Sequence, residues 1–216
     1  MKFSRNNPSD RYLYLQSMYR QMHLEGEPGL GRPAEVTFAG FSLAPQIGRI
    51  RELIRRTGAQ SILDYGSGKG KQYEPRELAD GNGGKWSGVA EYWGIQSIVC
   101  YDPCYPPYSD IPTDMFDGVI STDVLEHCPE EDIGWILDEI FGFAKRFVFA
   151  NVACYPAKKV LPNGENAHCM IKPLDWWRDT VSDVAARNPG VIWEFWIQHT
   201  VTDSSGVRIV EEKIKG

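Results

Sequence analysis

The sequence predicts an α/β fold in which a mostly parallel sheet carries helices on both faces. Three observations predict it. Short apolar runs typical of buried parallel strands alternate along the chain with segments of helical periodicity. One of these runs, at 61–64, passes directly into a glycine-rich loop at 66–70, a connection common at strand ends in such sheets. The last two runs, at 191–197 and 207–214, flank a polar turn at 203–206 and predict a terminal antiparallel pair.

The composition is that of one globular domain spanning residues 1–216. Hydrophobic residues make up 42% of the chain and charged residues 24%, which is enough apolar material for a packed core. The net charge of -6 argues against the broad basic surface that binding of duplex nucleic acid requires. No apolar run reaches the ~18 residues of a membrane span, and the N-terminus lacks the apolar core of a signal peptide, so we expect a cytoplasmic protein.

The cysteines predict neither disulfides nor a metal site. They are odd in number and show no CxxC spacing, which fits reduced thiols. A zinc site that combines Cys100, Cys104 and a histidine is disfavoured, because Cys100 falls in the middle of a predicted strand. We therefore expect no bound metal. The five residues are Cys100, Cys104, Cys128, Cys154 and Cys169.

Residues 1–40 predict a helical cap at the N-terminus. Residues 9–23 begin with cap-type side chains and continue with apolar residues at helical spacing, so we expect a helix there. Glycines and prolines then break regular structure, and helical periodicity resumes at 44–57. The tyrosines of the first helix could fold over a ligand as a lid, but their helical spacing favours packing. They are Tyr12, Tyr14 and Tyr19.

The first crossover, which follows strand 61–64, is predicted to carry an insertion at 71–94. Residues 80–84 are rich in glycine and predict a flexible break, after which a short helical segment is expected at 89–93. A second strand is predicted at 97–102. The crossover is therefore expected to be longer than usual.

The rest of the chain continues the alternation of strands and helices. The next clear strand, at 116–121, is joined to the previous one only by the proline-rich stretch 103–115. That stretch is too short for a helix and a further full strand, so the third-strand region of the sheet should be shortened. The elements expected after it are a helix at 130–143, a strand at 146–150 and a helix at 175–187.

The glycine loop predicts a nucleotide-like ligand, because glycines let the backbone approach a ligand closely. A phosphate-binding Walker loop needs GxxxxGK followed by Ser or Thr, whereas here Lys71 is followed by Gln72. A dinucleotide loop needs GxGxxG, but the third glycine, Gly70, comes one residue early. NAD and FAD are therefore less favoured.

The remaining pattern, an acidic residue followed by GxGxG at Asp64-Tyr65-Gly66-Ser67-Gly68-Lys69-Gly70, resembles motif I of class I S-adenosylmethionine (SAM)-dependent methyltransferases. The segment 116–127, FDGVISTDVLEH, resembles the fourth-strand motif FDxVxxxxVLEH of the small-molecule methyltransferases of the type 11/12 kind. The similarity covers about residues 60–150. It implies a Rossmann-like three-layer sandwich with SAM as cofactor.

By that resemblance, Asp64, Gly66 and Gly68 would contact SAM, and Asp102 would accept hydrogen bonds from its ribose. Asp102 comes 38 residues after Asp64, where about 20 is usual, and the insertion accounts for the difference. The full expected cofactor-binding set is Asp64, Tyr65, Gly66, Ser67, Gly68, Asp102, Pro103, Asp123 and Val124.

A second methyltransferase-like motif is interpreted as a loop without a catalytic role. Tyr105-Pro106-Pro107-Tyr108 is similar to the [DNS]PP[YFW] motif of DNA amino-methyltransferases. Its first residue offers no amide or carboxylate oxygen to a target amine, and it follows the second strand rather than the fourth. A proline-stiffened loop is the favoured interpretation.

Two histidines are candidate catalytic bases, because a hydroxyl acceptor must lose a proton when it is methylated. His127 follows the fourth-strand segment, where it could equally pack or cap the next helix. His168 lies in the long polar loop 161–173, where it could equally be solvated beside a turn. The residues expected to bind or enclose the acceptor are Asn166, Lys172 and Trp176.

Together these patterns favour a SAM-dependent methyltransferase that transfers a methyl group to oxygen or nitrogen of a small polar acceptor. S-adenosylhomocysteine (SAH) would be the product. One alternative is a module that binds SAM or SAH without catalysis. The other, less favoured by the loop spacing, is an NAD-dependent oxidoreductase.

Overall fold

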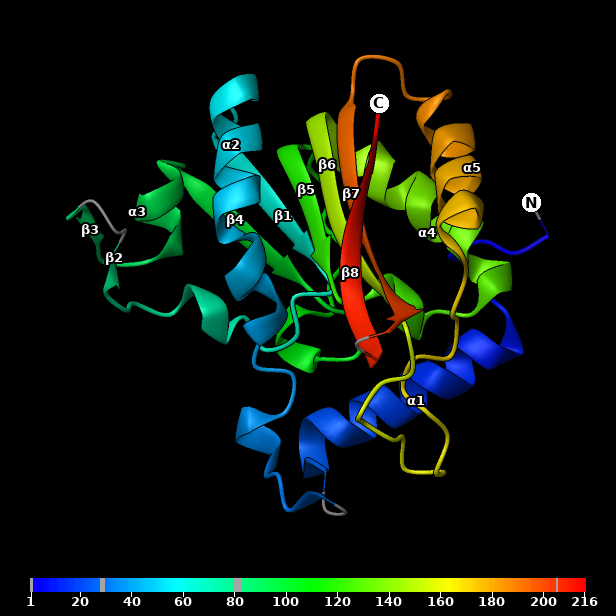
Figure 1. The fold of residues 1–216 in the computed structure, drawn as a ribbon. Helices are drawn as coiled ribbons and strands as arrows, with labels where there is room; N and C mark the ends of the chain where they lie inside the picture. The colour runs from blue at the N-terminus through cyan, green and yellow to red at the C-terminus, as the bar shows by residue number, and fades with distance from the viewer. Residues whose placement is uncertain (1, 28–29, 80–82, 205) are drawn as a thin grey trace.

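The computed structural model describes residues 2–27, 30–79, 83–204 and 206–216. Their main feature is a six-stranded sheet with the strand order β4-β1-β5-β6-β7-β8 (Figure 1). The first five strands of this order are parallel, and β8 is antiparallel to β7. The strands are β1 (Ser61–Tyr65), β4 (Ser97–Tyr101), β5 (Phe116–Thr122), β6 (Ala144–Cys154), β7 (Ile192–Asp203) and β8 (Gly206–Lys215).

Helices cover both faces of the sheet and make it the middle of three layers (Figure 1). Successive side chains of a strand point to opposite faces, so β1 sends Ile62 toward α2 and α3 and Leu63 toward α4 and α5. The first pair of helices is α2 (Ile47–Thr57) and α3 (Val89–Trp93), and the second is α4 (Glu130–Phe143) and α5 (Leu174–Ala185). The predicted Rossmann-like sandwich, with its C-terminal antiparallel strand, is confirmed.

The third-strand region is shortened, as the sequence predicts. β4 forms the edge of the sheet, and residues 102–115 contain only one turn of 3₁₀ helix, η5 (Pro106–Tyr108). Two consecutive prolines lie in that turn, and proline cannot donate a ladder hydrogen bond. This fully described stretch therefore adds no strand to the sheet.

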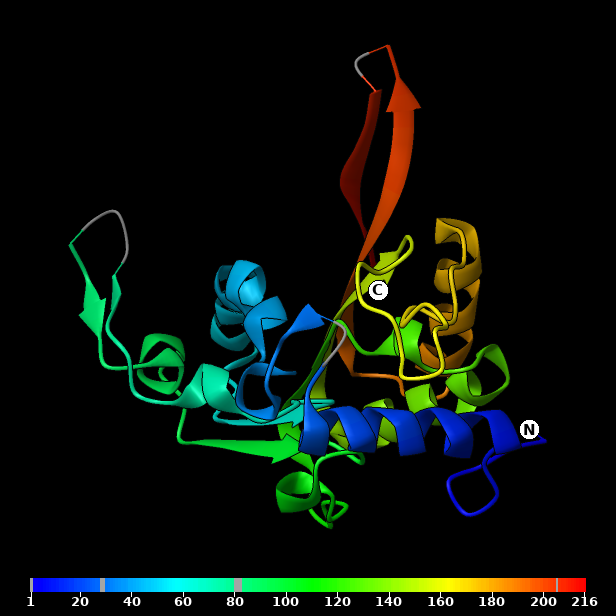
Figure 2. The ribbon, with the colours of Figure 1, turned by 90° about the horizontal axis from the view of Figure 1, so that it is seen from below.

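The first crossover has no long helix. After the glycine loop come a 3₁₀ turn, η4 (Lys71–Tyr73), a small hairpin of β2 (Leu78–Ala79) and β3 (Lys85–Trp86), and the short helix α3. The hairpin projects from the body beside α2 (Figures 1 and 2). α3 matches the helical segment predicted at 89–93, whereas residues 80–82 of the predicted flexible break lie outside the described part of the chain.

The N-terminal cap crosses the end of the sheet at which the parallel strands finish. α1 (Asp10–Glu25) runs below that end of the sheet (Figures 1 and 2). Two 3₁₀ segments, η2 (Ala34–Val36) and η3 (Phe41–Gln46), then lead into α2. Ser9 begins α1 as predicted, because its Oγ accepts a hydrogen bond from the Tyr12 amide at 3.0 Å.

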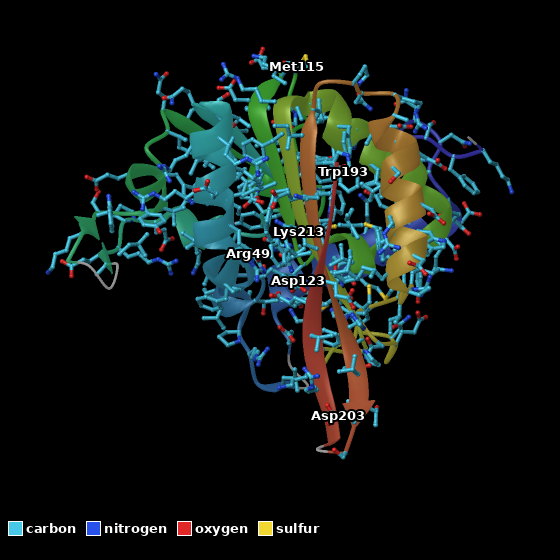
Figure 3. The ribbon with its side chains drawn as sticks, turned by 45° about the horizontal axis from the view of Figure 1, so that its top comes forward. Arg49, Met115, Asp123, Trp193, Asp203 and Lys213 are labelled. Carbon is cyan, nitrogen blue, oxygen red and sulfur yellow. The ribbon has the colours of Figure 1, made fainter. Side chains whose placement is uncertain are left out.

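The terminal hairpin is longer than predicted. β7 and β8 continue well beyond the other strands, and Figure 2 shows the hairpin projecting from the body. Figure 3 places Asp203 at its tip and Met115 at the opposite end of the molecule. The predicted turn at 203–206 lies there, although Ser205 is outside the described residues. Among the helices of the described ranges, none combines the length and apolar character that crossing a membrane requires.

Candidate functional site

A cavity of about 810 Å³ lies between the carboxyl ends of the parallel strands and the N-terminal cap. This is the position at which open α/β sheets bind ligands, and the volume suits a ligand of nucleoside size together with a small second molecule. One wall comes from α1 and the segment 30–42, and the other comes from the loops that follow β1, β4, β5 and β6. Figure 3 labels Asp123 at this lower end of the strands.

The glycines of the loop let neighbouring segments of the chain pack directly against its backbone. Gly66 and Gly68 have φ values of 86° and 60°, in the left-handed region that favours glycine. A Cβ on Gly66 would meet Val124 Cγ2 at 2.4 Å, and one on Gly68 would meet the Phe38 carbonyl oxygen at 2.4 Å. The amides of Gly66 and Ser67 both donate to the Tyr101 carbonyl, at 2.7 and 3.0 Å. The loop thus joins the ends of β1, β4 and β5 beneath the cap.

Asp102, directly after β4, supports the glycine loop from the cavity side. Its Oδ2 accepts from the Gly68 amide at 2.9 Å and its Oδ1 accepts from the Cys104 amide at 2.8 Å. Burial raises the pKa of Asp102 to about 6, although the amides of Cys104 and Gly68 oppose the shift. Each carboxylate oxygen keeps a lone pair, so Asp102 could accept further hydrogen bonds from a ligand hydroxyl.

Asp64 and Tyr65 lie outside the cavity lining. Asp64 is 1% exposed, and its Oδ2 accepts from Gln72 Nε2 at 2.9 Å and from the Tyr73 hydroxyl at 2.7 Å. Its Oδ1 has no hydrogen-bond partner, and burial raises its pKa to about 6. Tyr65 points to the other face of the sheet, where its hydroxyl donates to Glu139 at 2.6 Å. The structure therefore separates these two residues from the remaining expected cofactor contacts.

The segment after β5 makes a sharp turn into the cavity. Asp123 has φ 62°, one of two described non-glycine residues with a positive φ. Such a backbone conformation costs of the order of 1 kcal/mol and is typical of functional sites. Its amide donates to the Asn151 carbonyl at 3.2 Å, and Val124 then packs over Gly66. Asp123 and Val124 both line the cavity, together with Pro103.

His127 lies in the 3₁₀ turn η6 (Leu125–His127) and faces the cap. Its Nδ1 is 2.9 Å from the Ala167 carbonyl oxygen and 2.8 Å from the Tyr19 hydroxyl, which itself donates to Ala167. A carbonyl oxygen only accepts, so Nδ1 carries the proton and Nε2 of the neutral ring carries the lone pair. Burial lowers the pKa of His127 to about 4, which keeps the ring neutral at neutral pH.

His168 has the same arrangement and lies next to His127. Its Nδ1 donates to the Tyr155 carbonyl at 2.5 Å, so its Nε2 also carries the lone pair. The rings of His127 and His168 meet edge to face with centroids 4.9 Å apart. The two histidines, which the sequence offered as separate candidates, therefore lie side by side with Asp123 in one cavity.

Glu126 lies behind this cluster and is fully buried. Its Oε1 accepts from the Ala153 amide at 2.6 Å, and its Oε2 has no hydrogen-bond partner. Burial, followed by the negative charge of Asp123, raises the pKa of Glu126 well above its usual range. The sequence pointed to this residue only as part of the VLEH motif.

The residues predicted to bind the acceptor do not line the cavity. Asn166 fixes the loop instead, because its Oδ1 accepts from the amides of Ala157 and His168, at 2.9 and 3.0 Å. Lys172 lies 2.5 Å from Glu130 Oε2 and 5.5 Å from the Trp176 ring centroid, on the outside of the site. Asn166 thus positions His168, whereas Lys172 and Trp176 have no contact with the cavity.

The cap contributes side chains that the sequence did not identify as site residues. His23 lies between the rings of Phe38 and Tyr105, at centroid distances of 4.7 and 5.1 Å. Burial, followed by the charges of Lys69 and Lys159, lowers the pKa of His23 to about 3. These residues have no motif, since α1 and the segment after it are brought to the site only by tertiary folding.

Comparison with known proteins supports the fold. The chain matches no protein-family model and no curated protein sequence. Among solved structures it is similar to the 1,6-didemethyltoxoflavin-N1-methyltransferase of Burkholderia thailandensis, crystallised with bound 1,6-didemethyltoxoflavin and S-adenosylhomocysteine. The TM-score is 0.53 at 12% sequence identity, over 95% of this chain and 88% of the other. The likeness therefore shows that the two proteins share a fold of the class that the sequence predicts.

Proposed function

We propose that this protein is a cytoplasmic SAM-dependent methyltransferase that acts on oxygen or nitrogen of a small polar molecule. The observation that carries the proposal is the single cavity of about 810 Å³, which brings Gly66, Gly68 and Asp102 together with His127 and His168. The cavity thus combines a glycine loop for the cofactor with imidazole side chains for the acceptor's proton, and methyl transfer to a hydroxyl requires both functions.

The residues that would hold SAM are the members of the expected set that reach the cavity: Gly66, Ser67, Gly68, Asp102, Pro103, Asp123 and Val124. The glycines leave room for the ligand, and the free lone pairs of Asp102 suit the hydroxyls of a ribose. Asp64 does not line the cavity and accepts hydrogen bonds from Gln72 and Tyr73, so we assign it to holding these two side chains behind the loop.

When bound, SAM supplies a methyl group on a positively charged sulfur that leaves as a neutral thioether. The protein then has to align the acceptor in line with the sulfur–carbon bond and to receive the proton that the acceptor loses. His127 or His168 receives it at Nε2, since the Nδ1 proton of each ring is held by a backbone carbonyl. A hydrogen bond of this kind fixes both the tautomer and the direction of the ring.

A small acceptor fits the surroundings of the cavity. The net charge of -6 disfavours an extended polyanion, and the cap encloses the space above the histidines. The structural neighbour is a methyltransferase crystallised with a small heterocyclic molecule, which supports the same class of acceptor.

Calorimetric titration of the full chain with SAM and SAH tests the proposal. We expect binding of one equivalent, and we expect His127→Ala and His168→Ala to slow SAH formation with a candidate acceptor at least ten-fold without weakening SAM binding. Lys172→Ala, outside the cavity, is the matched control and should leave both measurements unchanged. The proposal would be refuted if folded protein did not bind SAM at millimolar SAM concentration.

A further inference from the structure

Three side chains in the cavity have the composition and spacing of a metal site. Asp123, His127 and His168 each offer one ligand atom, and these atoms all lie within 4.8 Å of one another. They come from the turn after β5, from η6 and from the loop after β6. His127 comes 4 residues after Asp123, and His168 comes 41 residues after His127. This spacing matches no metal-ligand motif, so the sequence alone did not indicate the cluster.

The hydrogen bonds behind the two rings prepare them as ligands. Nδ1 of His127 donates to the Ala167 carbonyl at 2.9 Å, and Nδ1 of His168 donates to the Tyr155 carbonyl at 2.5 Å. Metal-binding histidines almost always donate their second ring nitrogen to a carbonyl or carboxylate, which fixes the tautomer and the ring orientation. Both rings of this pair have that second contact, and each keeps an Nε2 lone pair for an ion.

The charge around the cluster favours a cation. Asp123 and Glu126 place two carboxyl groups on one short segment, and Glu126 is fully buried. Among the described residues, neither carboxylate forms an ion pair with a lysine or arginine. Lys159, which also lines the cavity, is 3.4 Å from Glu27 instead. A cation bound at Asp123 would therefore offset the charge of a carboxylate that has no ion pair among the described residues.

The spacing allows an ion after a small adjustment of the side chains. At the upper limit of 4.8 Å, an ion at the centre of the three atoms would be about 2.8 Å from each of them. Bonds to histidine nitrogen and to carboxylate oxygen are about 2.1 Å, so each side chain has to move inward by less than about 1 Å. Asp123 faces the cavity and has room for such a movement.

We propose that Asp123, His127 and His168 bind one divalent first-row transition-metal ion, with its open coordination positions facing the cavity. Two imidazole nitrogens and one carboxylate oxygen suit manganese, iron, cobalt, nickel or zinc, whereas magnesium and calcium prefer oxygen ligands alone. We assign the open coordination positions of the ion to an oxygen of the methyl acceptor, an assignment that rests on the proposed function. The histidines would then act as ligands instead of bases, and the ion would lower the pKa of the acceptor's hydroxyl group so that its proton leaves to water before the methyl group is transferred.

Cobalt(II) titration of chelator-treated full-length protein tests the site. We expect one equivalent of Co²⁺ to bind, with visible absorption bands of nitrogen and oxygen coordination, and Mg²⁺ to bind at least ten-fold more weakly. His168→Ala and Asp123→Asn should each lower the Co²⁺ affinity at least ten-fold, while circular dichroism shows that both variants remain folded. His199→Gln, which removes an exposed histidine paired with Glu212 on the terminal hairpin, is the matched control and should bind Co²⁺ as the wild type does.

The outcome separates this inference from the proposed function. Wild-type protein that takes up no Co²⁺, or variants that bind it as tightly as the wild type, would overturn the metal site even if SAM binds. Loss of Co²⁺ binding in the two variants combined with no SAM binding in any of them would uphold the metal site and overturn the methyltransferase proposal. Equal affinities for Mg²⁺ and Co²⁺ would contradict the assignment of the ion.

Discussion

At the scale of single residues, a buried carboxyl group next to the glycine loop makes stability depend on pH. Burial raises the pKa of Asp64 to about 6 in the folded protein, against about 3.9 in an unfolded chain. Between these values the folded state holds more protons than the unfolded state. The free energy of unfolding due to this group therefore falls as pH rises from about 4 to about 6 and is constant above that.

Asp64→Asn should remove this dependence. Relative to the wild type, we expect the unfolding free energy of the variant to rise between pH 4 and pH 7 by up to about 3 kcal/mol. Asparagine Oδ1 can still accept from Gln72 and Tyr73, so the local hydrogen bonds of Oδ2 persist. Urea denaturation at several pH values measures the difference. Asp110→Asn, at an exposed position, is the control, and an equal pH-dependent difference in that variant would contradict the prediction.

Site residues at strand ends could be predicted from the sequence, whereas those in the loop after β6 could not. Asp102 ends a predicted strand, and Asp123 and Val124 come two and three residues after another, so their place at the sheet end follows from the strand order. Asn166 and Lys172 belong to a loop whose course depends on tertiary contacts, such as the bond from Asn166 Nδ2 to the Ala157 carbonyl at 2.8 Å. No periodicity encodes such a contact, and the polar character of the loop was a poor guide to which side chains face the cavity.

At the scale of elements, the N-cap residue of α1, Ser9, also links that helix to α4. Ser9 Oγ accepts from the Tyr12 amide at 3.0 Å and donates to Asp132 Oδ2 at 2.5 Å, and Asp132 is fully buried at the start of α4. Ser9→Ala should lower the unfolding free energy by about 1–2 kcal/mol, because the cap is lost and a buried carboxylate loses a donor. Ser17→Ala, on the exposed face of α1, should change it by less than about 0.5 kcal/mol. Chemical denaturation of both variants measures the contrast, and equal losses would refute it.

The packing of β5 against β6 depends on a glycine. A Cβ on Gly118 would meet the Phe147 ring at 2.3 Å and Ile62 Cδ1 at 2.9 Å. Gly118→Ala should therefore destabilise the protein by about 1–3 kcal/mol through overpacking. Gly142→Ala, in α4 with no atom within 4 Å of the added carbon, should instead be neutral or stabilising by up to about 1 kcal/mol. Thermal or urea unfolding gives both values, and a larger loss for Gly142→Ala would contradict the packing argument.

Elements with strong periodicity were predicted closely, whereas connections were not. α4 spans 130–143 in both the prediction and the structure, because its apolar residues keep helical spacing through that range. β6 extends to 144–154, beyond the predicted 146–150, since its pairing continues along the projecting strand β7. The hairpin of β2 and β3 has two residues per strand, too few for any repeating pattern.

At the scale of the whole molecule, the cap and the sheet complete one site between them. The sequence favoured packing for the tyrosines of α1, and Tyr12 does pack, with its ring 5.3 Å from that of Trp135. Tyr19 of the same helix contacts His127 at 2.8 Å, so one helix both contributes to the core and encloses the cavity. Opening of the cap would therefore expose the site without unfolding the sheet.

Lys159 is one of the side chains that tie the loop after β6 to the cap. Its Nζ lies 3.4 Å from Oε1 of the buried Glu27 and 3.9 Å from the Phe38 ring centroid. In Lys159→Ala, the one ion pair left to Glu27 among the described residues is with Arg32, at 4.0 Å, so the closed cap should lose at least about 1.4 kcal/mol. We expect hydrogen exchange of amides within 32–42 to accelerate at least ten-fold, since 1.4 kcal/mol corresponds to a factor of ten in the opening equilibrium.

The positions at which hydrogen exchange accelerates in Lys159→Ala show whether the cap opens as a unit. Amides of β5 lie in the centre of the sheet and should change much less than those of 32–42, because they exchange through larger openings. Lys158→Ala, next in sequence and more exposed, is the matched control and should leave exchange within 32–42 near the wild-type rate. A uniform acceleration over sheet and cap would mean that Lys159 supports the whole fold. Unchanged exchange in the cap would mean that other contacts, such as the Lys69 amide to the Phe38 carbonyl at 3.0 Å, hold it closed.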